Sequence, residues 1–252
     1  MKKDAAKTVS ILGSTGSVGC NTLDLIQRNP EAFRVVALTA NGSATALAEQ
    51  ARALDAEFAV VADESRYADL KDLLSGTGIE IAAGRGGLIE AAARDAEFVM
   101  SAIVGAAGLQ PTLAAIDRGA TIGLANKETL VCAGELMIDA AREKGAALVP
   151  VDSEHNAIFQ VFESSHRDAI SKIILTASGG PFRLSSLEEM KLVTPREAVA
   201  HPNWHMGAKI SVDSATMMNK GLELIEAHHL FQMPEDQIEI LVHPQSVVHS
   251  MV

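Results

Sequence analysis

The sequence predicts an α/β protein in which a parallel sheet covered by helices precedes a smaller α+β region. Three observations support this prediction. Short apolar runs alternate with helical stretches over the first 150 residues, a glycine-rich turn follows the first run, and the alternation stops after Val151. Strands joined by short helical connections are typical of parallel sheets covered on both faces. We therefore expect two domains, residues 1–150 and residues 151–252.

The first region contains short apolar runs that read as buried strands, and each is followed by a longer stretch with helical spacing. A further short strand is possible at residues 79–82. The expected strands are residues 8–12, 33–39, 58–62, 98–103, 121–125 and 147–151. The expected helices are residues 18–28, 44–54, 65–74, 87–94, 110–118 and 127–144.

The second region has more strands relative to its helices, which favours an α+β domain. Its longest expected helix ends before Pro234, because proline cannot continue a helix. The expected elements are a helix near residues 155–163, a strand at 170–177, a helix at 214–231, and strands at 238–242 and 247–252.

The composition excludes several classes of function. A formal charge of -11 and an aromatic content of 4% argue against a nucleic-acid-binding surface. No apolar run reaches the roughly 18 residues that a membrane span requires. The two cysteines, Cys20 and Cys132, are too few for a disulfide framework, and their helical settings predict core positions. These features indicate a cytoplasmic protein without a membrane or nucleic-acid partner.

Gly13-Ser14-Thr15-Gly16-Ser17-Val18-Gly19 follows the first expected strand and opens the first helix. Glycines there let the backbone approach a pyrophosphate, and the helix N-terminus offers N–H groups, so the turn indicates a Rossmann-like dinucleotide site. An ordinary tight turn is the alternative. The second strand ends in Asn41-Gly42-Ser43 without the carboxylate that usually selects NAD, which favours NADP unless this is a plain loop.

Asn126-Lys127-Glu128 follows the fifth of the six principal expected strands. A lysine at a buried strand-to-helix junction is unusual, because lysine prefers solvent. Lys127 is then either a cation that faces substrate oxygens or a helix-start residue whose amine reaches water.

Asp152 and Glu154 stand two residues apart directly after a strand. In extended backbone this spacing places both carboxylates on one side. Two close carboxylates offer oxygen ligands, which suit Mg²⁺ or Mn²⁺. A solvated acidic helix cap is the alternative.

Asn219, Lys220 and Glu223 share one side of the long expected helix. Together with Ser214 they can bind an anion, and Glu223 can complete a metal site; a polar solvent face is the alternative. The glycine turn after Ser178 is either a phosphate cradle or a simple chain reversal. Trp204 falls in an expected loop, where an indole either fills a core or closes over a ligand.

The chain resembles the 1-deoxy-D-xylulose 5-phosphate reductoisomerase family over its whole length. Each motif falls in the family's order, which makes the combination specific. The motifs are GSTGSVG at 13–19, AIVGAAGL at 102–109, LANKE at 124–128, PVDSEHNAIFQ at 150–160, ASGGPF at 177–182, HPNW at 201–204 and KISVDSATMMNKGLE at 209–223.

The resemblance implies conversion of 1-deoxy-D-xylulose 5-phosphate to 2-C-methyl-D-erythritol 4-phosphate by a cytoplasmic homodimer, with NADPH and a divalent metal. It also implies a role for individual residues. NADPH would lie on Thr15, Gly16, Ser17, Val18, Asn41, Gly42, Ser43, Asn126, Glu128 and Gly207. The metal would be held by Asp152, Glu154 and Glu223, and Lys127 and His201 would join them as catalytic residues. The substrate would meet Lys127, Ser153, Glu154, Ser178, His201, Ser214, Asn219, Lys220 and Glu223, under a flap at 201–207.

Two features depart from the family pattern. Asn41-Gly42-Ser43 lacks the lysine that many relatives carry in this turn, which weakens the expected grip on a 2′-phosphate. The family also continues past Val252 into a C-terminal helical domain that this sequence lacks. Two other functions therefore stay open: another NADP-dependent dehydrogenase, or a catalytically weak NADPH-binding fragment.

Overall fold

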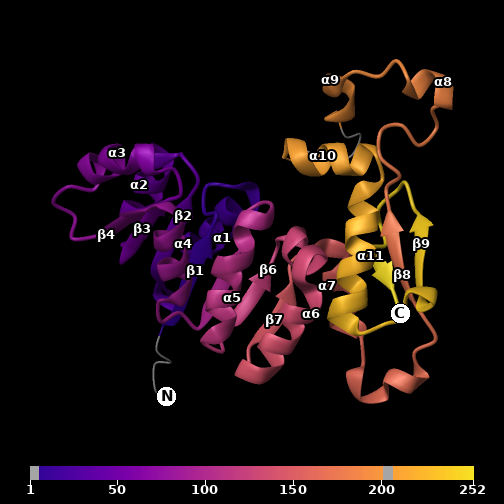
Figure 1. Ribbon diagram of the computed structural model, residues 1–252, viewed down its shortest axis with the longest axis horizontal. Coiled ribbons are helices and arrows are strands. Elements are labelled where there is room, and N and C mark those ends of the chain that lie inside the picture. Colours follow the sequence, from indigo (N-terminus) through magenta and orange to yellow (C-terminus); the bar gives the residue numbers. More distant parts are fainter. Residues whose placement is uncertain (1–5, 201–206) are drawn as a thin grey trace. The chain divides into compact units, whose positions relative to one another are not determined.

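The computed structural model describes residues 6–200 and 207–252. The chain divides into two compact units, Met1–Val149 and Pro150–Val252. The first unit runs from indigo through magenta to rose in Figure 1, and the second from rose through orange to yellow. Within the described residues, no helix combines the length and the apolar character that a membrane crossing requires.

The first unit is a seven-stranded sheet in the order β4-β3-β2-β1-β5-β6-β7. The strand pairs from β4 through β6 are all parallel. The strands are β1 (Lys7–Leu12), β2 (Phe33–Ala40), β3 (Phe58–Val61), β4 (Glu80–Ala83), β5 (Phe98–Ser101), β6 (Thr121–Leu124) and β7 (Ala147–Pro150). The helices are α1 (Ser17–Arg28), α2 (Ala44–Ala53), α3 (Tyr67–Leu73), α4 (Gly84–Ala93), α5 (Leu109–Asp117) and α6 (Lys127–Lys144).

The sheet confirms the predicted Rossmann-like α/β fold, including the short strand β4. Its central strands are buried almost without interruption, as their apolar runs predict; Ile11, Leu38 and Ile122 have no exposed surface. The strand order reverses at β1. From β1 the chain adds β2, β3 and β4 on one side of the sheet, and then β5, β6 and β7 on the other side. Ligands of open α/β sheets bind at the carboxyl ends of the strands at such a reversal. The Gly13–Gly19 turn lies at this position.

The second unit is the predicted α+β region, built on a three-stranded sheet in the order β10-β8-β9. β8 (Ile173–Ala177) pairs in parallel with β9 (Ile238–Val242) and antiparallel with the short β10 (Ser250–Met251). α7 (Ser153–Val161) and α11 (Met218–Phe231) pack against β8, and Figure 1 shows α11 beside β8 and β9. The core joins these elements through Ile158, Ile173, Leu175, Ala227, Phe231, Met233 and Ile238. The remaining helices are α8 (Leu187–Met190), α9 (Pro195–Ala198) and α10 (Ala208–Ala215).

Three expectations are corrected. The helix expected at 214–231 is two helices, α10 and α11, because Met217 between them adopts a left-handed backbone with φ of 62°. The strand expected at 247–252 is reduced to β10, because the chain before it forms a turn. Cys20 and Cys132 are exposed rather than buried, since each lies on the outward side of its helix.

Candidate active site

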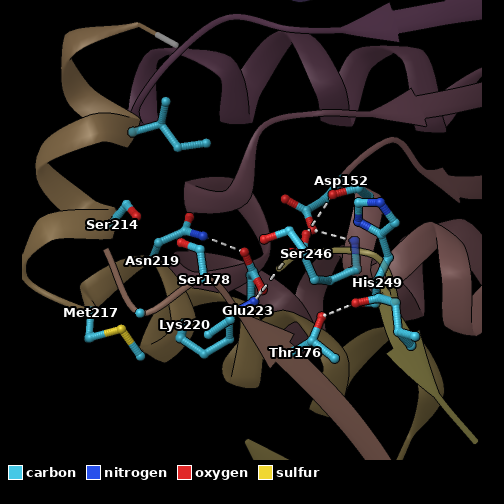
Figure 2. Close-up of a pocket in the computed structure, with 16 residues that line it drawn as sticks. Asp152, Thr176, Ser178, Ser214, Met217, Asn219, Lys220, Glu223, Ser246 and His249 are labelled. Carbon is cyan, nitrogen blue, oxygen red and sulfur yellow. Dashed lines mark hydrogen bonds and ion pairs between the residues drawn. The ribbon is translucent and has the colours of Figure 1, made fainter. Parts of the chain in front are cut away.

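A cavity of about 360 Å³ lies within the second unit, at the carboxyl end of β8. Side chains from α7, the glycine turn after β8, α10, α11 and the segment before β10 line it. Figure 2 shows them converging. The lining brings together most of the residues assigned to substrate or metal from the sequence: Asp152, Ser153, Glu154, Ser178, Ser214, Asn219, Lys220 and Glu223.

Asp152 and Glu154 reach the cavity by a route different from the predicted one. Asp152 is the N-cap of α7 and its Oδ1 accepts a hydrogen bond from the Glu154 backbone N–H at 3.2 Å. The two residues are therefore not in extended backbone. The alternative reading of an acidic helix cap is right in part. The cap is not simply a solvated one, because Glu154 is largely removed from water and faces Glu223 and Lys220.

Carboxylate oxygens of Asp152, Glu154 and Glu223 all lie within 4.8 Å of one another. Two ligands that bind one Mg²⁺ at about 2.1 Å are about 3–4 Å apart, so small side-chain movements would close this spacing. The oxygen-only donor set is the one that hard divalent cations prefer. The geometry therefore fits a Mg²⁺ or Mn²⁺ ion.

Asn219, Lys220 and Glu223 lie on one face of α11, as their spacing predicts. Glu223 has no exposed surface, and its carboxylate accepts hydrogen bonds from the Asn219 amide and the Lys220 ammonium. Lys220 is also buried, and its Nζ lies 3.7 Å from Glu154 Oε1. Three carboxylates and one ammonium leave a formal charge of −2 when all are ionised, which a divalent cation would neutralise.

The crowding of like charges changes the acidity of Glu154. Burial raises the pKa of its carboxyl from 4.5 to about 7, and the charges of Glu223 and Asp152 act in the same direction. The Lys220 ammonium and a hydrogen bond from the Ser153 hydroxyl oppose this increase. A cation bound here would replace the proton on Glu154.

We expect the Mn²⁺ affinity to fall about tenfold per pH unit as the pH is lowered below about 7, because protons and metal compete for Glu154. Without metal, the stability of the fold changes with pH in the opposite direction to the metal affinity. A carboxyl whose folded pKa is raised stabilises the fold while protonated, and this contribution is lost as the pH rises from 4.5 through about 7. Calorimetry of Mn²⁺ binding in buffers of different ionisation enthalpy measures the proton that the metal displaces from Glu154. A Mn²⁺ affinity that is constant across this range would contradict the assignment.

His155 was not singled out from the sequence, yet it joins the two helices that carry the carboxylates. Its ring has no exposed surface, and Nε2 lies 2.9 Å from the Glu223 carbonyl oxygen. Since a carbonyl only accepts hydrogen bonds, Nε2 carries a proton. Nδ1 lies 3.6 Å from Asp152 Oδ1 and 3.8 Å from the buried Glu226. In the sequence, only its position directly after Glu154 hinted that His155 lies near the carboxylates.

The Gly13–Gly19 turn has the backbone that a phosphate-binding turn requires. Gly13 has φ of +89°, and a Cβ at this position would lie 2.7 Å from the Ala102 carbonyl oxygen. Gly16 precedes α1 and has no side chain to cap the helix, so N–H groups of the first turn can meet an anion. Ser14 anchors the turn to β2 and α2: its N–H donates to the Thr39 carbonyl, and its hydroxyl donates to Gln50 of α2.

The Asn41-Gly42-Ser43 turn joins β2 to α2, and a carboxylate that the sequence did not reveal lies beside it. The Asp63 N–H donates to the Asn41 carbonyl at 2.9 Å, and a Cβ on Gly42 would lie 3.7 Å from Asp63 Oδ2. Hydrogen bonds from Ser65 lower the pKa of Asp63, so it stays charged. The turn therefore has an acidic neighbour from the segment after β3, which no spacing in the sequence indicates.

Asn126 and Lys127 lie at the end of β6 in the first unit. The Asn126 Oδ1 caps α6 by accepting from the Thr129 N–H, and its Nδ2 donates to the Gly105 carbonyl at 2.9 Å. Lys127 is 7% exposed, so its ammonium does not simply extend into water. Glu128 is half-buried in the first turn of α6.

The expected flap is only partly described. His201 and Trp204 lie outside the described residues, together with the rest of 201–206. Gly207 is exposed and immediately precedes α10.

The fold and the cavity define the class of protein: a Rossmann-like α/β protein whose second unit holds three clustered carboxylates. Family models narrow it further. Residues 9–134 match the 1-deoxy-D-xylulose 5-phosphate reductoisomerase family, and residues 148–231 match the C-terminal domain of that reductoisomerase. The chain belongs to the 1-deoxy-D-xylulose 5-phosphate reductoisomerase family.

Individual relatives agree with the family models. The reductoisomerase of Rhodospirillum centenum is 65% identical over 249 residues, which cover 99% of this chain and 62% of the relative. A structure of the Zymomonas mobilis reductoisomerase in complex with NADPH aligns with a TM-score of 0.92 at 60% identity, covering 98% of this chain and 64% of that one. A reductoisomerase in complex with NADPH, fosmidomycin and magnesium aligns with a TM-score of 0.92 at 46% identity, covering 97% and 63%. The chain thus spans 62–64% of the length of these relatives.

Proposed function

We propose that the protein is an NADPH- and divalent-metal-dependent oxidoreductase that converts 1-deoxy-D-xylulose 5-phosphate to 2-C-methyl-D-erythritol 4-phosphate, a step of isoprenoid biosynthesis. The observation that carries this proposal is the cavity in the second unit. Its lining combines three clustered carboxylates with hydroxyl, amide and ammonium groups suited to a phosphate. Family membership supplies the identity of the reaction.

In this proposal Asp152, Glu154 and Glu223 hold the metal. A bound Mg²⁺ or Mn²⁺ would act as a Lewis acid on substrate oxygens. The carboxylate spacing supports the assignment, and so does the magnesium named in the complex of the 46%-identical relative. Ser153, whose hydroxyl donates to Glu154 at 2.7 Å, would meet the substrate beside the metal.

The substrate phosphate would bind to Ser178, Ser214, Asn219 and Lys220, which line the same cavity. This phosphate takes no part in bond cleavage, so its binding energy can hold the reacting carbons in place. The Lys220 ammonium is already oriented by Glu223, which reduces the entropy cost of binding an anion.

NADPH would bind to the first unit and supply the hydride. The open first turn of α1 supports this site, as does the Zymomonas mobilis complex with NADPH. The residues assigned to it are Thr15, Gly16, Ser17, Val18, Asn41, Gly42, Ser43, Asn126 and Glu128, with Gly207 from the second unit.

The reaction consists of a rearrangement and a reduction. A carbon–carbon bond of the ketose breaks and a new one forms, which gives a branched aldehyde; hydride from NADPH and one proton then convert this aldehyde to an alcohol. Lys127 would add positive charge near the substrate oxygens. The 201–207 segment, with His201 and Trp204, would close over the substrate and exclude water.

One experiment separates the three candidate functions. We expect NADPH absorbance to fall when 1-deoxy-D-xylulose 5-phosphate and Mn²⁺ are both present, and to stay constant when EDTA removes the metal. Turnover that resists EDTA would instead indicate another NADP-dependent dehydrogenase. NADPH binding without oxidation would indicate a catalytically weak nucleotide-binding fragment.

The cofactor preference is testable at the Asn41-Gly42-Ser43 turn. We expect higher kcat/KM with NADPH than with NADH, and we expect Ser43→Asp to weaken NADPH about tenfold, because it adds a charge near the 2′-phosphate. Ser43→Asn is the matched control, since it adds similar volume without charge. Aspartate suits the N-cap of α2, which Ser43 occupies, so lost stability would not explain the result. Parity of the two cofactors in the unmodified protein would refute the preference.

We further propose that the protein acts as a cytoplasmic homodimer on a small sugar phosphate, without a nucleic-acid or membrane partner. The family resemblance and the net charge of -11 support this. Sedimentation equilibrium tests the dimer, and a monomer at micromolar concentration would contradict it.

A further inference from the structure

Residues 243–249 connect the two edges of the three-stranded sheet by crossing the carboxyl end of β8. β9 ends at Val242 on one side of β8, and β10 begins at Ser250 on the other. From this crossing segment Ser246, Val248 and His249 line the cavity together with residues of α11. The position of the segment therefore sets one wall of the proposed substrate site.

His243 holds the segment in a tight turn although it is not among the cavity-lining residues of the described chain. Its Nε2 accepts hydrogen bonds from the backbone N–H groups of Val247, at 3.1 Å, and Val248, at 3.2 Å. Its own backbone N–H donates to the Ala177 carbonyl at 2.7 Å, which anchors the turn to β8. Because Nε2 accepts both bonds, it carries no proton.

The turn needs this support, because its backbone is not favourable by itself. Ser246 has φ of 49°, a left-handed conformation that residues with a side chain rarely adopt. Such conformations persist where surrounding contacts impose them. The buried Thr176 adds a second contact: its hydroxyl lies 3.0 Å from the Val248 carbonyl and 2.8 Å from the His249 carbonyl. Figure 2 shows Thr176 beside His249.

We propose that His243 is a positioning residue for the substrate side of this cavity, acting through the Val247 and Val248 backbone to hold Ser246 and His249 at the wall. His243 does not touch the metal ligands in this arrangement; it fixes the distance between the wall and the phosphate-binding groups of α11. The identity of the ligand rests on the proposed function, whereas the effect of the ring on the turn does not.

The test compares three variants of the protein. His243→Leu removes the acceptor, His243→Asn keeps a polar side chain that is too short to reach both N–H groups, and His243→Gln places an amide oxygen near the position of Nε2. We expect faster amide hydrogen exchange at Val247 and Val248 in the Leu and Asn variants. We also expect their KM for 1-deoxy-D-xylulose 5-phosphate to rise about tenfold, the scale of one or two lost hydrogen bonds, with a smaller change in kcat. The Gln variant should recover both.

Mn²⁺ affinity is the internal control, because Asp152, Glu154 and Glu223 come from α7 and α11 and should keep it within about twofold. Unchanged exchange at Val247 and Val248 in a folded Leu or Asn variant would overturn the proposal, and so would loosened amides with an unchanged KM. If Leu fails to fold, the Asn and Gln pair decides. If the unmodified protein does not turn over the sugar phosphate, the proposed function fails separately; exchange at the two amides and binding of inorganic phosphate then decide the role of His243.

Discussion

Glu223→Gln is expected to weaken Mn²⁺ binding about 10- to 100-fold and to lower activity by at least tenfold. The substitution keeps the shape of the side chain but removes one of three clustered carboxylates. It also removes the charge that the buried Lys220 contacts, so we expect the free energy of unfolding to fall by about 3 kcal/mol. The pKa of Glu154 should fall below about 7, because the Glu223 charge is one of the factors that raise it. Mn²⁺ titration and urea unfolding measure these effects.

Glu188→Gln is the matched control for this variant. Glu188 and Lys191 form an ion pair with the same spacing of three residues, but both side chains are exposed. Surface pairs contribute little, so we expect a change of at most about 0.5 kcal/mol in stability and none in Mn²⁺ affinity. Equal effects of the two substitutions would mean that Glu223 acts only through general charge and is no ligand.

Gly19→Ala is expected to raise the dissociation constant for NADPH at least tenfold and to destabilise the first unit by about 1–3 kcal/mol. A Cβ at Gly19 would lie 2.3 Å from the Gly13 carbonyl oxygen and 2.6 Å from the Ser14 backbone. These contacts are with backbone atoms of the Gly13–Gly19 turn, to which we assign the cofactor, so the turn itself must move. Cofactor fluorescence titration and thermal unfolding report the two effects separately.

Gly86→Ala provides the opposite outcome within the same unit. Gly86 lies in α4, and a Cβ there would meet no atom within 4 Å. Alanine is the better helix former, so we expect a gain of about 0.5–1 kcal/mol with NADPH binding unchanged. If both substitutions behaved alike, the close approach at Gly19 would carry no functional meaning.

The sequence by itself determined the α/β sheet, because each strand of a buried parallel sheet is an apolar run and each crossover is a helix with its own period. It also placed the glycine turn after β1, since that turn is local. Asn219, Lys220 and Glu223 share a helix face at fixed spacing, so their grouping was predictable without tertiary information.

Only the tertiary structure decided how the parts of the second unit combine. The break at Met217 cannot be read from helix propensity, because residues 214–231 carry a continuous helical pattern that the left-handed backbone interrupts. Asp152 and Glu154 meet Glu223 through a helix cap and not through an extended strand, since α7 packs beside α11. Three further residues have roles that depend on hydrogen bonds or close contacts with other segments or with nearby backbone: His155, Asp63 and His243. Burial and long-range contacts assign their roles, and neither quantity is encoded in local spacing.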